Sequence, residues 1–248
     1  MRDLLIGELS KKEYLACKLQ DFEKLINDEK LNRLLMFYDI LMEWNSFMNL
    51  TAITDFNEVV LKHFSDSIMV LKYADIDEGA MILDFGTGAG FPGIPLKILR
   101  PDLNITLMDS LNKRIKFLDE VISKLELSNI TAIHGRGEEL GRKNEYRQKY
   151  DFVLSRAVAK LSILSECCLP FVKKGGSFIS YKSGEISDEV KEAETAVKIL
   201  GGSKAKTYYF KLDEIIERSF VIIKKTEDTP QKYPRGGGKP FKEPLKNL

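Results

Sequence analysis

The sequence predicts an α/β protein whose mostly parallel, doubly wound sheet is preceded by helices and closes with an antiparallel last strand. Three observations predict this fold: a purely helical pattern at the N-terminus, short apolar runs that then alternate with helical patterns, and a glycine-rich turn after the first apolar run. Alternation of strands and helices indicates βαβ units, which build parallel sheets. The pattern divides the chain into an N-terminal helical extension (1–74), a central domain (75–228) and a C-terminal tail (229–248).

The extension is predicted to hold two main helices. Apolar residues recur every three or four positions from Leu31 to Trp44, and again from Val59 to Leu71. Trp44 suits either the core or a base-stacking platform. His63 and Asp66 lie one helical turn apart, and are interpreted as either an acid–base pair or a packed surface pair.

The central domain is predicted to carry seven strands with helices between them. The expected strands are 80–85, 104–108, 130–134, 151–154, 177–182, 206–211 and 218–224. One expected helix follows the glycine-rich turn and ends at Leu99, and three others cover 113–127, 162–171 and 185–200. The last two strands have a short connection and should form an antiparallel hairpin at one end of the sheet.

The strongest local signal is the glycine-rich run from Gly86 to Gly90, directly after the first strand. Glycines at positions such as Gly86 and Gly88 permit a tight turn and let the backbone approach a ligand closely. The dinucleotide fingerprint G-x-G-x-x-G fails because Phe91 stands where its third glycine would fall. Asp84 precedes the turn, which suits a ligand without phosphates and with a positive centre.

S-adenosylmethionine (SAM) is such a ligand. An acid after the second strand should take its ribose hydroxyls, and Asp109 follows Gly90 by 19 residues. Two alternatives remain: a glycine turn that merely reverses the chain, and a nicotinamide-dependent dehydrogenase. The loop His134–Glu139 should lie near the adenine, although it also reads as a helix start with acids that complement the helix dipole.

The loop Ser155–Val158 occupies the position that faces the substrate in methyltransferases. It lacks the Asn/Asp-Pro-Pro-aromatic run of many amino-group methyltransferases. Cys167 and Cys168 fall in a helix, where small buried thiols are more usual than nucleophiles. The remaining chemistry needs neither base nor nucleophile, as in methylation of guanine N7, whose lone pair is free. No catalytic residue is assigned; Arg156 and Arg136 are positioning candidates for phosphate or guanine O6.

Charge and cysteine content limit the partners. With 38 basic against 37 acidic residues, a uniformly basic coat is excluded. The basic Pro/Gly tail is expected to pack as neither helix nor strand; it is a solvated end, or a clamp that lays Arg235 and Lys239 along an RNA backbone. Three cysteines without a CxxC exclude a zinc knot and suit a reducing cytosol, and the chain lacks an apolar run of ~18 residues, so we expect a cytoplasmic protein with no metal and no membrane contact.

Several motifs together resemble one family. They are Asp84-Phe85-Gly86-Thr87-Gly88-Ala89-Gly90-Phe91-Pro92-Gly93-Ile94-Pro95-Leu96, Glu43-Trp44-Asn45, Asn49-Leu50-Thr51-Ala52-Ile53, His63-Phe64-Ser65-Asp66-Ser67, Asp109-Ser110-Leu111-Asn112-Lys113-Arg114, Ser155-Arg156-Ala157 and Tyr233-Pro234-Arg235. In this order they resemble the bacterial small-subunit ribosomal RNA methyltransferase G family, also called glucose-inhibited division protein B.

The resemblance implies a class I SAM-dependent methyltransferase with a Rossmann-like fold. It implies methylation of N7 of a guanosine in 16S ribosomal RNA, at position 527 in the usual rRNA numbering. The implied partner is 16S rRNA or the 30S subunit, with no obligate protein partner. The implied cofactor contacts are Gly86, Phe91, the backbone of Gly137 and Glu138, and Arg156. Alternatives are a SAM-dependent enzyme for another RNA, a small molecule or a protein, and a non-catalytic ribosome-binding factor.

Overall fold

The protein is described by a computed structural model covering residues 9–245; residues 1–8 and 246–248, the outer ends of the predicted extension and tail, lie outside the described residues. The strands are β1 (Met81–Phe85), β2 (Asn104–Asp109), β3 (Ile130–His134), β4 (Tyr150–Arg156), β5 (Val172–Lys182), β6 (Lys206–Leu212) and β7 (Ile216–Lys224). The helices are α1 (Lys11–Lys18), η2 (Gln20–Leu25), α2 (Asp28–Met48), α3 (Phe56–Val59), η3 (Val60–Ser65), α4 (Asp66–Ile68), η4 (Met69–Lys72), α5 (Gly93–Leu99), α6 (Asn112–Lys124), α7 (Gly137–Leu140), α8 (Leu161–Cys168), η5 (Leu169–Phe171), α9 (Ser187–Ile199) and α10 (Lys239–Lys242).

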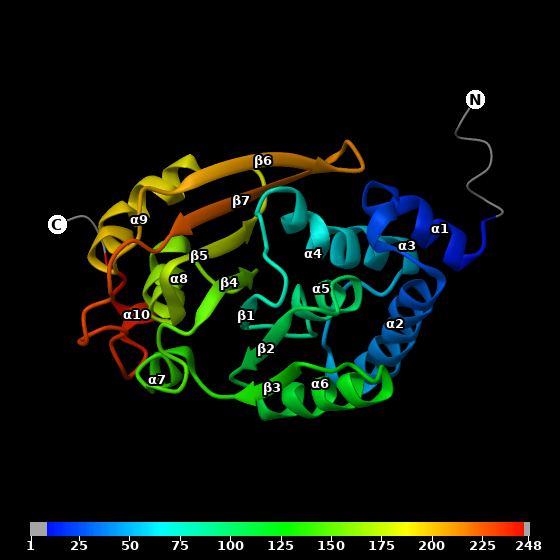
Figure 1. Ribbon diagram of the computed structural model, residues 1–248, viewed down its shortest axis with the longest axis horizontal. Helices are drawn as coiled ribbons and strands as arrows, with labels where there is room; N and C mark the ends of the chain where they lie inside the picture. Colours follow the sequence, from blue (N-terminus) through cyan, green and yellow to red (C-terminus); the bar gives the residue numbers. More distant parts are fainter. Residues whose placement is uncertain (1–8, 246–248) are drawn as a thin grey trace.

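The described strands form one sheet in the order β3-β2-β1-β4-β5-β7-β6. Strands β1 to β5 are parallel, whereas β7 is antiparallel to both of its neighbours. The expected doubly wound sheet, its antiparallel last strand and the edge hairpin of β6 and β7 are therefore confirmed. Figure 1 shows α5 and α6 on one face and α8 and α9 on the other.

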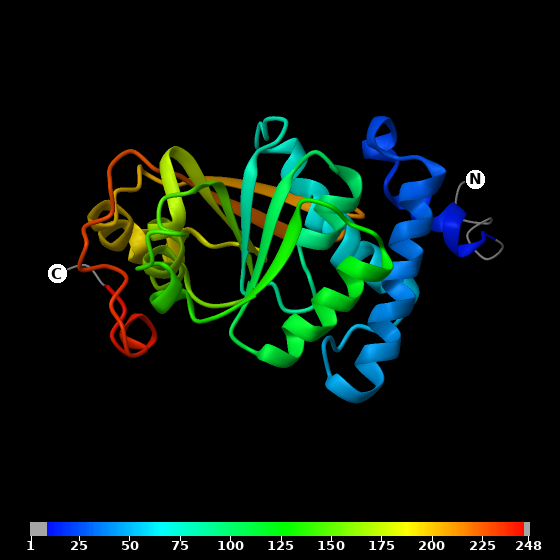
Figure 2. The same ribbon diagram turned by 60° about the horizontal axis from the view of Figure 1, so that its bottom comes forward.

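The N-terminal helices share a hydrophobic core with the layer of α5 and α6. The ring of Phe37 in α2 lies 5.3 Å from that of Phe91, measured between centroids. Trp44 packs against Phe117 of α6 with centroids 5.6 Å apart, so its core interpretation is confirmed. Figure 2 shows α2 beside α6, on the side of the molecule opposite the tail. Burial of these aromatic rings joins the extension to the sheet domain.

The helix expected over 59–71 is observed as one helical run from Phe56 to Lys72, but it contains a π-helical turn, η3, between α3 and α4 and ends in the 3₁₀ turn η4. Five consecutive residues, Phe64 to Ile68, are buried. An amphipathic helix buries one face, so packing on all sides shapes this segment rather than local periodicity.

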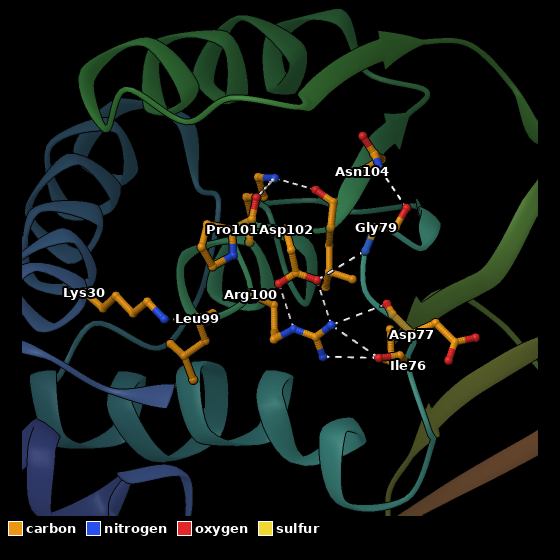
Figure 3. Close-up of polar contacts among 11 residues, drawn as sticks. Lys30, Ile76, Asp77, Gly79, Leu99, Arg100, Pro101, Asp102 and Asn104 are labelled. Carbon is orange, nitrogen blue, oxygen red and sulfur yellow. Dashed lines mark hydrogen bonds and ion pairs between the residues drawn. The ribbon is translucent and has the colours of Figure 1, made fainter. Parts of the chain in front are cut away.

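A group of polar contacts stabilises the molecule near the amino ends of β1 and β2 (Figure 3). Arg100, after α5, binds both carboxylate oxygens of Asp102 and the carbonyl of Ile76. The ammonium of Lys30 in α2 donates to the carbonyl of Leu99 at 2.8 Å. These bonds satisfy carbonyls at the end of a helix and in the loop before β1, and they hold α2 to the central domain.

The tail packs, contrary to the expectation that it forms neither helix nor strand. Tyr233 is buried, and residues Lys239–Lys242 form the short helix α10. The guanidinium of Arg147 donates to the carbonyls of Gly141, Thr229 and Tyr233. A proline-rich segment offers carbonyls without a sheet partner, and the forked guanidinium supplies donors to them. Among the described residues, no helix combines the length and apolarity needed to span a bilayer.

Candidate active site

The glycine turn after β1 is hydrogen-bonded to β2. The backbone N–H groups of Gly86 and Thr87 both donate to the carbonyl of Met108, at 2.9 and 3.0 Å. Gly86 has a φ of +69°, and a Cβ there would lie 2.7 Å from a methyl group of Val158. Only glycine fits this conformation and this space, so the turn leaves an open cradle where the parallel strands end.

Asp84 braces the turn from behind. It is fully buried, and its Oδ2 accepts hydrogen bonds from Thr87 Oγ1 at 2.6 Å and from the N–H of Gly93 at 2.8 Å. Burial raises the pKa of Asp84 to about 6. It is absent from the lining of the cradle, so the structure gives this acid a bracing role rather than the expected role beside a positive centre.

A pocket of about 610 Å³ opens over the cradle, at the carboxyl ends of β1 to β4. Among the predicted cofactor residues, Gly86, Asp109, Gly137 and Glu138 line it, together with Arg136. A Cβ on Gly137 would lie 2.3 Å from the ring of Phe85, so this second glycine also keeps the pocket open. We call this the cofactor pocket.

Asp109 is oriented by three neighbours. Its Oδ2 accepts from the N–H of Gly88 at 3.0 Å and from Arg114 at 3.1 Å, while Oδ1 accepts from the N–H of Leu111 at 2.9 Å. Gly88 therefore holds the acid rather than lining the pocket. Each carboxylate oxygen has two acceptor sites, so Asp109 retains capacity for a ligand hydroxyl.

Phe91 and Arg156, also predicted cofactor contacts, lie behind the glycine turn. The ring of Phe91 is 5% exposed and stacks on His63, with centroids 4.5 Å apart. The guanidinium of Arg156 lies 5.0 Å from the same ring. Neither residue lines the cofactor pocket; Arg156 instead lines a neighbouring one.

This second pocket has a volume of about 540 Å³ and shares Ala157 and Val158 with the cofactor pocket. We call it the acceptor pocket. Its titratable side chains come from five elements: Lys62 and His63 of η3, Asp66 of α4, Arg156 of β4, Tyr181 and Lys182 of β5, and Arg218 of β7. Sequence reasoning missed Tyr181, Lys182 and Arg218, because strand residues far along the chain carry no local signal for a site.

Asp66 is the centre of the acceptor pocket. Its Oδ2 accepts from Arg156 Nη1 at 2.9 Å, and its Oδ1 accepts from Arg218 Nε at 3.1 Å. The expected surface pair of His63 and Asp66 is wrong: Asp66 is 4% exposed and binds two arginines, while His63 contacts Thr51 Oγ1 at 2.9 Å.

The titratable groups of the acceptor pocket are poor bases. Burial and the neighbouring Arg156 lower the pKa of His63 to about 3. Burial raises the pKa of Tyr181 well above its usual value, and its hydroxyl donates to the carbonyl of Ser67. Lys182 is held by Glu189 at 2.6 Å. None of these groups is poised to remove a proton near neutral pH.

The adjacent cysteines of α8 take no part in either pocket. Cys167 and Cys168 are fully buried, and burial raises the pKa of both thiols. The thiolate is the nucleophilic form of cysteine, so these two are packing residues, as expected.

The tail contributes a wall of the cofactor pocket through Gly238, Phe241 and Lys242, which sequence reasoning also missed. Arg235, a predicted RNA contact, instead forms a bidentate pair with the buried Glu166 of α8, at 2.9 and 2.7 Å. Lys239, the other candidate, is exposed at the start of α10.

Comparisons with known proteins agree with this arrangement. A family model described as rRNA small subunit methyltransferase G matches residues 30–221. A ribosomal RNA small subunit methyltransferase G from Lachnoclostridium phytofermentans is 57% identical over 221 residues, covering 89% of this chain and 91% of the relative. The protein of the same name from Staphylococcus aureus (strain JH9) is 48% identical, covering 94% of this chain and 98% of the relative.

Solved structures share the fold at low identity. A SAM-dependent O-methyltransferase from Thermotoga maritima has a TM-score of 0.51 at 15% identity, over 77% of this chain and 73% of that one. The YcgJ protein from Bacillus subtilis has a TM-score of 0.51 at 11% identity, over 66% of this chain and all of that one. At these identities the likeness shows a shared fold.

Proposed function

This chain belongs to the rRNA small subunit methyltransferase G family, and we propose that it transfers the methyl group of SAM to N7 of a guanosine in 16S ribosomal RNA. The proposed target is guanosine 527 in the usual rRNA numbering, presented on the 30S subunit or its RNA. The names of the relatives, the methyltransferase fold and the two adjoining pockets support this proposal.

The residues that line the cofactor pocket suit SAM. The glycine cradle at Gly86 and Gly137 admits a ligand against the backbone, and Asp109 offers carboxylate oxygens for ribose hydroxyls. The backbone of Gly137 and Glu138 lies where the adenine is proposed to bind. Phe91 and Arg156 would act from behind the turn, by holding its position. SAM, when bound, supplies an electrophilic methyl group.

The observation that carries the choice of N7 is the lack of a usable base among the described residues of the acceptor pocket. His63 has a pKa of about 3, and each oxygen of Asp66 accepts a hydrogen bond from an arginine. Methylation of an amino or hydroxyl group requires loss of a proton, whereas N7 carries none. Guanine N7 donates its lone pair to the methyl group, and positive charge moves from sulfonium to guanine without proton transfer. The residues then need to provide proximity and alignment.

The deciding experiment is methyl transfer from labelled SAM to 30S particles from cells that lack this protein, followed by nucleoside analysis. Label recovered as 7-methylguanosine, mapped to position 527, is the expected result. Label in a different nucleoside, or no label although SAM binding is verified separately, would refute the proposed reaction. Parallel incubation with naked 16S rRNA distinguishes RNA from the assembled subunit as substrate.

A further inference from the structure

We propose that Asp66, Arg156 and Arg218, here called the Asp66 cluster, bind a phosphate group of the target nucleotide, with Arg218 as the residue that contacts it. This inference rests on the proposed function, because it assigns the acceptor pocket to an RNA nucleotide. It adds a phosphate subsite to that pocket, and it gives Asp66 the role of a positioning residue.

The first step is a charge count of the acceptor pocket. Lys62 is paired with Glu58, and Lys182 with Glu189, each at 2.6 Å. His63 is neutral near pH 7 because its pKa is about 3. The Asp66 cluster therefore holds the excess: two guanidinium groups share a single carboxylate, at 2.9 and 3.1 Å, which leaves one positive charge. One phosphodiester neutralises that charge.

The second step is the geometry of the two arginines. Arg156 is used within the protein: it also donates to the carbonyl of Lys62, contacts His63 and lies over Phe91. Arg218 bonds through Nε to Asp66 and through Nη1 to the carbonyl of Glu217, and its Nη2 has no partner among the described residues. Arg218 lines the acceptor pocket, and its bonds to Asp66 and Glu217 fix the guanidinium, so Nη2 is a positioned donor for a ligand.

The third step separates a phosphate from the base edge as the ligand. Guanine O6 and N7 lie side by side on the Hoogsteen edge, and N7 becomes part of a cation once methylated. A guanidinium at that edge would oppose the charge that develops there. A phosphate keeps its negative charge throughout, so it is the group of the nucleotide that gains most from the cluster. The base can then extend toward Ala157 and Val158, which both pockets share.

The test compares Arg218→Gln with a matched control, Lys224→Gln. Both positions lie on β7, but Lys224 pairs with Ser177 at the opposite end of the sheet from the pocket. The dissociation constant for methyl-deficient 30S particles is measured against salt concentration, with SAM affinity measured separately. We expect Arg218→Gln to weaken 30S binding about tenfold and to flatten the log–log salt dependence by roughly 0.7 to 0.9. The SAM affinity of Arg218→Gln should equal that of the wild type. The 30S affinity of Lys224→Gln and its salt dependence should also equal those of the wild type.

Asp66→Asn tests the positioning role, because the two possible roles of Asp66 predict opposite changes in RNA affinity. If Asp66 only offsets positive charge, its removal strengthens RNA binding, because the cluster gains a net charge. If Asp66 holds Arg218 in place, binding weakens although the pocket becomes more positive. We expect weaker binding, and tighter binding would overturn the positioning role.

Two outcomes would overturn the phosphate subsite. One is wild-type 30S affinity in Arg218→Gln. The other is weaker binding with an unchanged salt dependence, which would indicate a contact to the base. If thermal unfolding shows that Arg218→Gln does not fold, Arg218→Lys replaces it; this variant keeps the charge and should keep the salt dependence while losing affinity. Absence of methyl transfer by the wild-type protein would instead refute the proposed function.

Discussion

Replacement of Arg235 by methionine should destabilise the protein rather than merely weaken RNA binding. Glu166 has no exposed surface and accepts three hydrogen bonds from Arg235: from its backbone N–H at 2.8 Å, Nε at 2.9 Å and Nη2 at 2.7 Å. Arg235→Met removes the latter two and the neutralising charge. Removing one member of a buried ion pair costs ~3 kcal/mol or more, because the other charge is left without compensation.

The measurement is chemical and thermal unfolding of Arg235→Met, Glu166→Gln and the double variant. A loss of ~3 kcal/mol lowers the melting temperature of a chain of this size by roughly 10 °C. The double variant should lose much less than the sum of the single variants, since it leaves no buried charge unpaired. Lys239→Met is the matched control, because this exposed tail lysine should leave the melting temperature unchanged.

SAM affinity provides a second readout of the same variant. Phe241 and Lys242 line the cofactor pocket and follow Arg235 closely along the chain. Loss of the pair between Arg235 and Glu166 should therefore weaken SAM binding as well. Unchanged stability and SAM affinity in Arg235→Met, together with a loss of RNA affinity, would refute this reasoning and restore the tail arginine to an RNA-binding role.

Three further outcomes are expected. Gly86→Val should abolish SAM binding, measured by calorimetry, because a Cβ would lie 2.7 Å from Val158; Gly236→Ala, with no atom near its would-be Cβ, should bind normally. Because burial raises the pKa of Asp84 from 3.8 to about 6, the stability of the native state falls as the pH rises from about 4 through 6, and it stays at the lower level above that. Asp84→Asn should therefore gain up to ~3 kcal/mol in urea unfolding near pH 8 and little near pH 4, and equal effects at both would contradict this. Of the three thiols, the exposed Cys17 alone should react with a thiol reagent in the native protein, and its modification should leave methyl transfer intact.

Most of the sheet could be predicted from the sequence because strand signals are local. The strand expected at 130–134 is observed with the same bounds, and the hairpin of β6 and β7 follows from its short connection. Strand β5 begins at Val172 rather than Ser177. Lys173 to Gly176 have weak strand propensity; the flanking Val172 and Ser177 pair with β4, and Gly175 and Gly176 form backbone hydrogen bonds with Lys225.

Part of the candidate site could also be predicted from the sequence, and part of it could not. Spacing after successive strands located Gly86, Asp109 and the loop His134–Glu139, because parallel strands end at one edge of the sheet, and the family resemblance singled out Gly137 and Glu138 within that loop. Spacing did not reveal that Phe91 is buried behind the turn. A motif gives the order of residues along the chain, but it does not give the direction in which each side chain points.

The sequence by itself determined the doubly wound fold, the glycine cradle and the family to which the chain belongs, since these depend on periodicity, turn chemistry and spacing over short stretches. Only the tertiary structure decided the partners of the charged side chains. Asp66 meets Arg218 across 152 positions, and Arg235 meets Glu166 across 69. A charged side chain carries no local signal of its partner, and burial makes that partner energetically decisive.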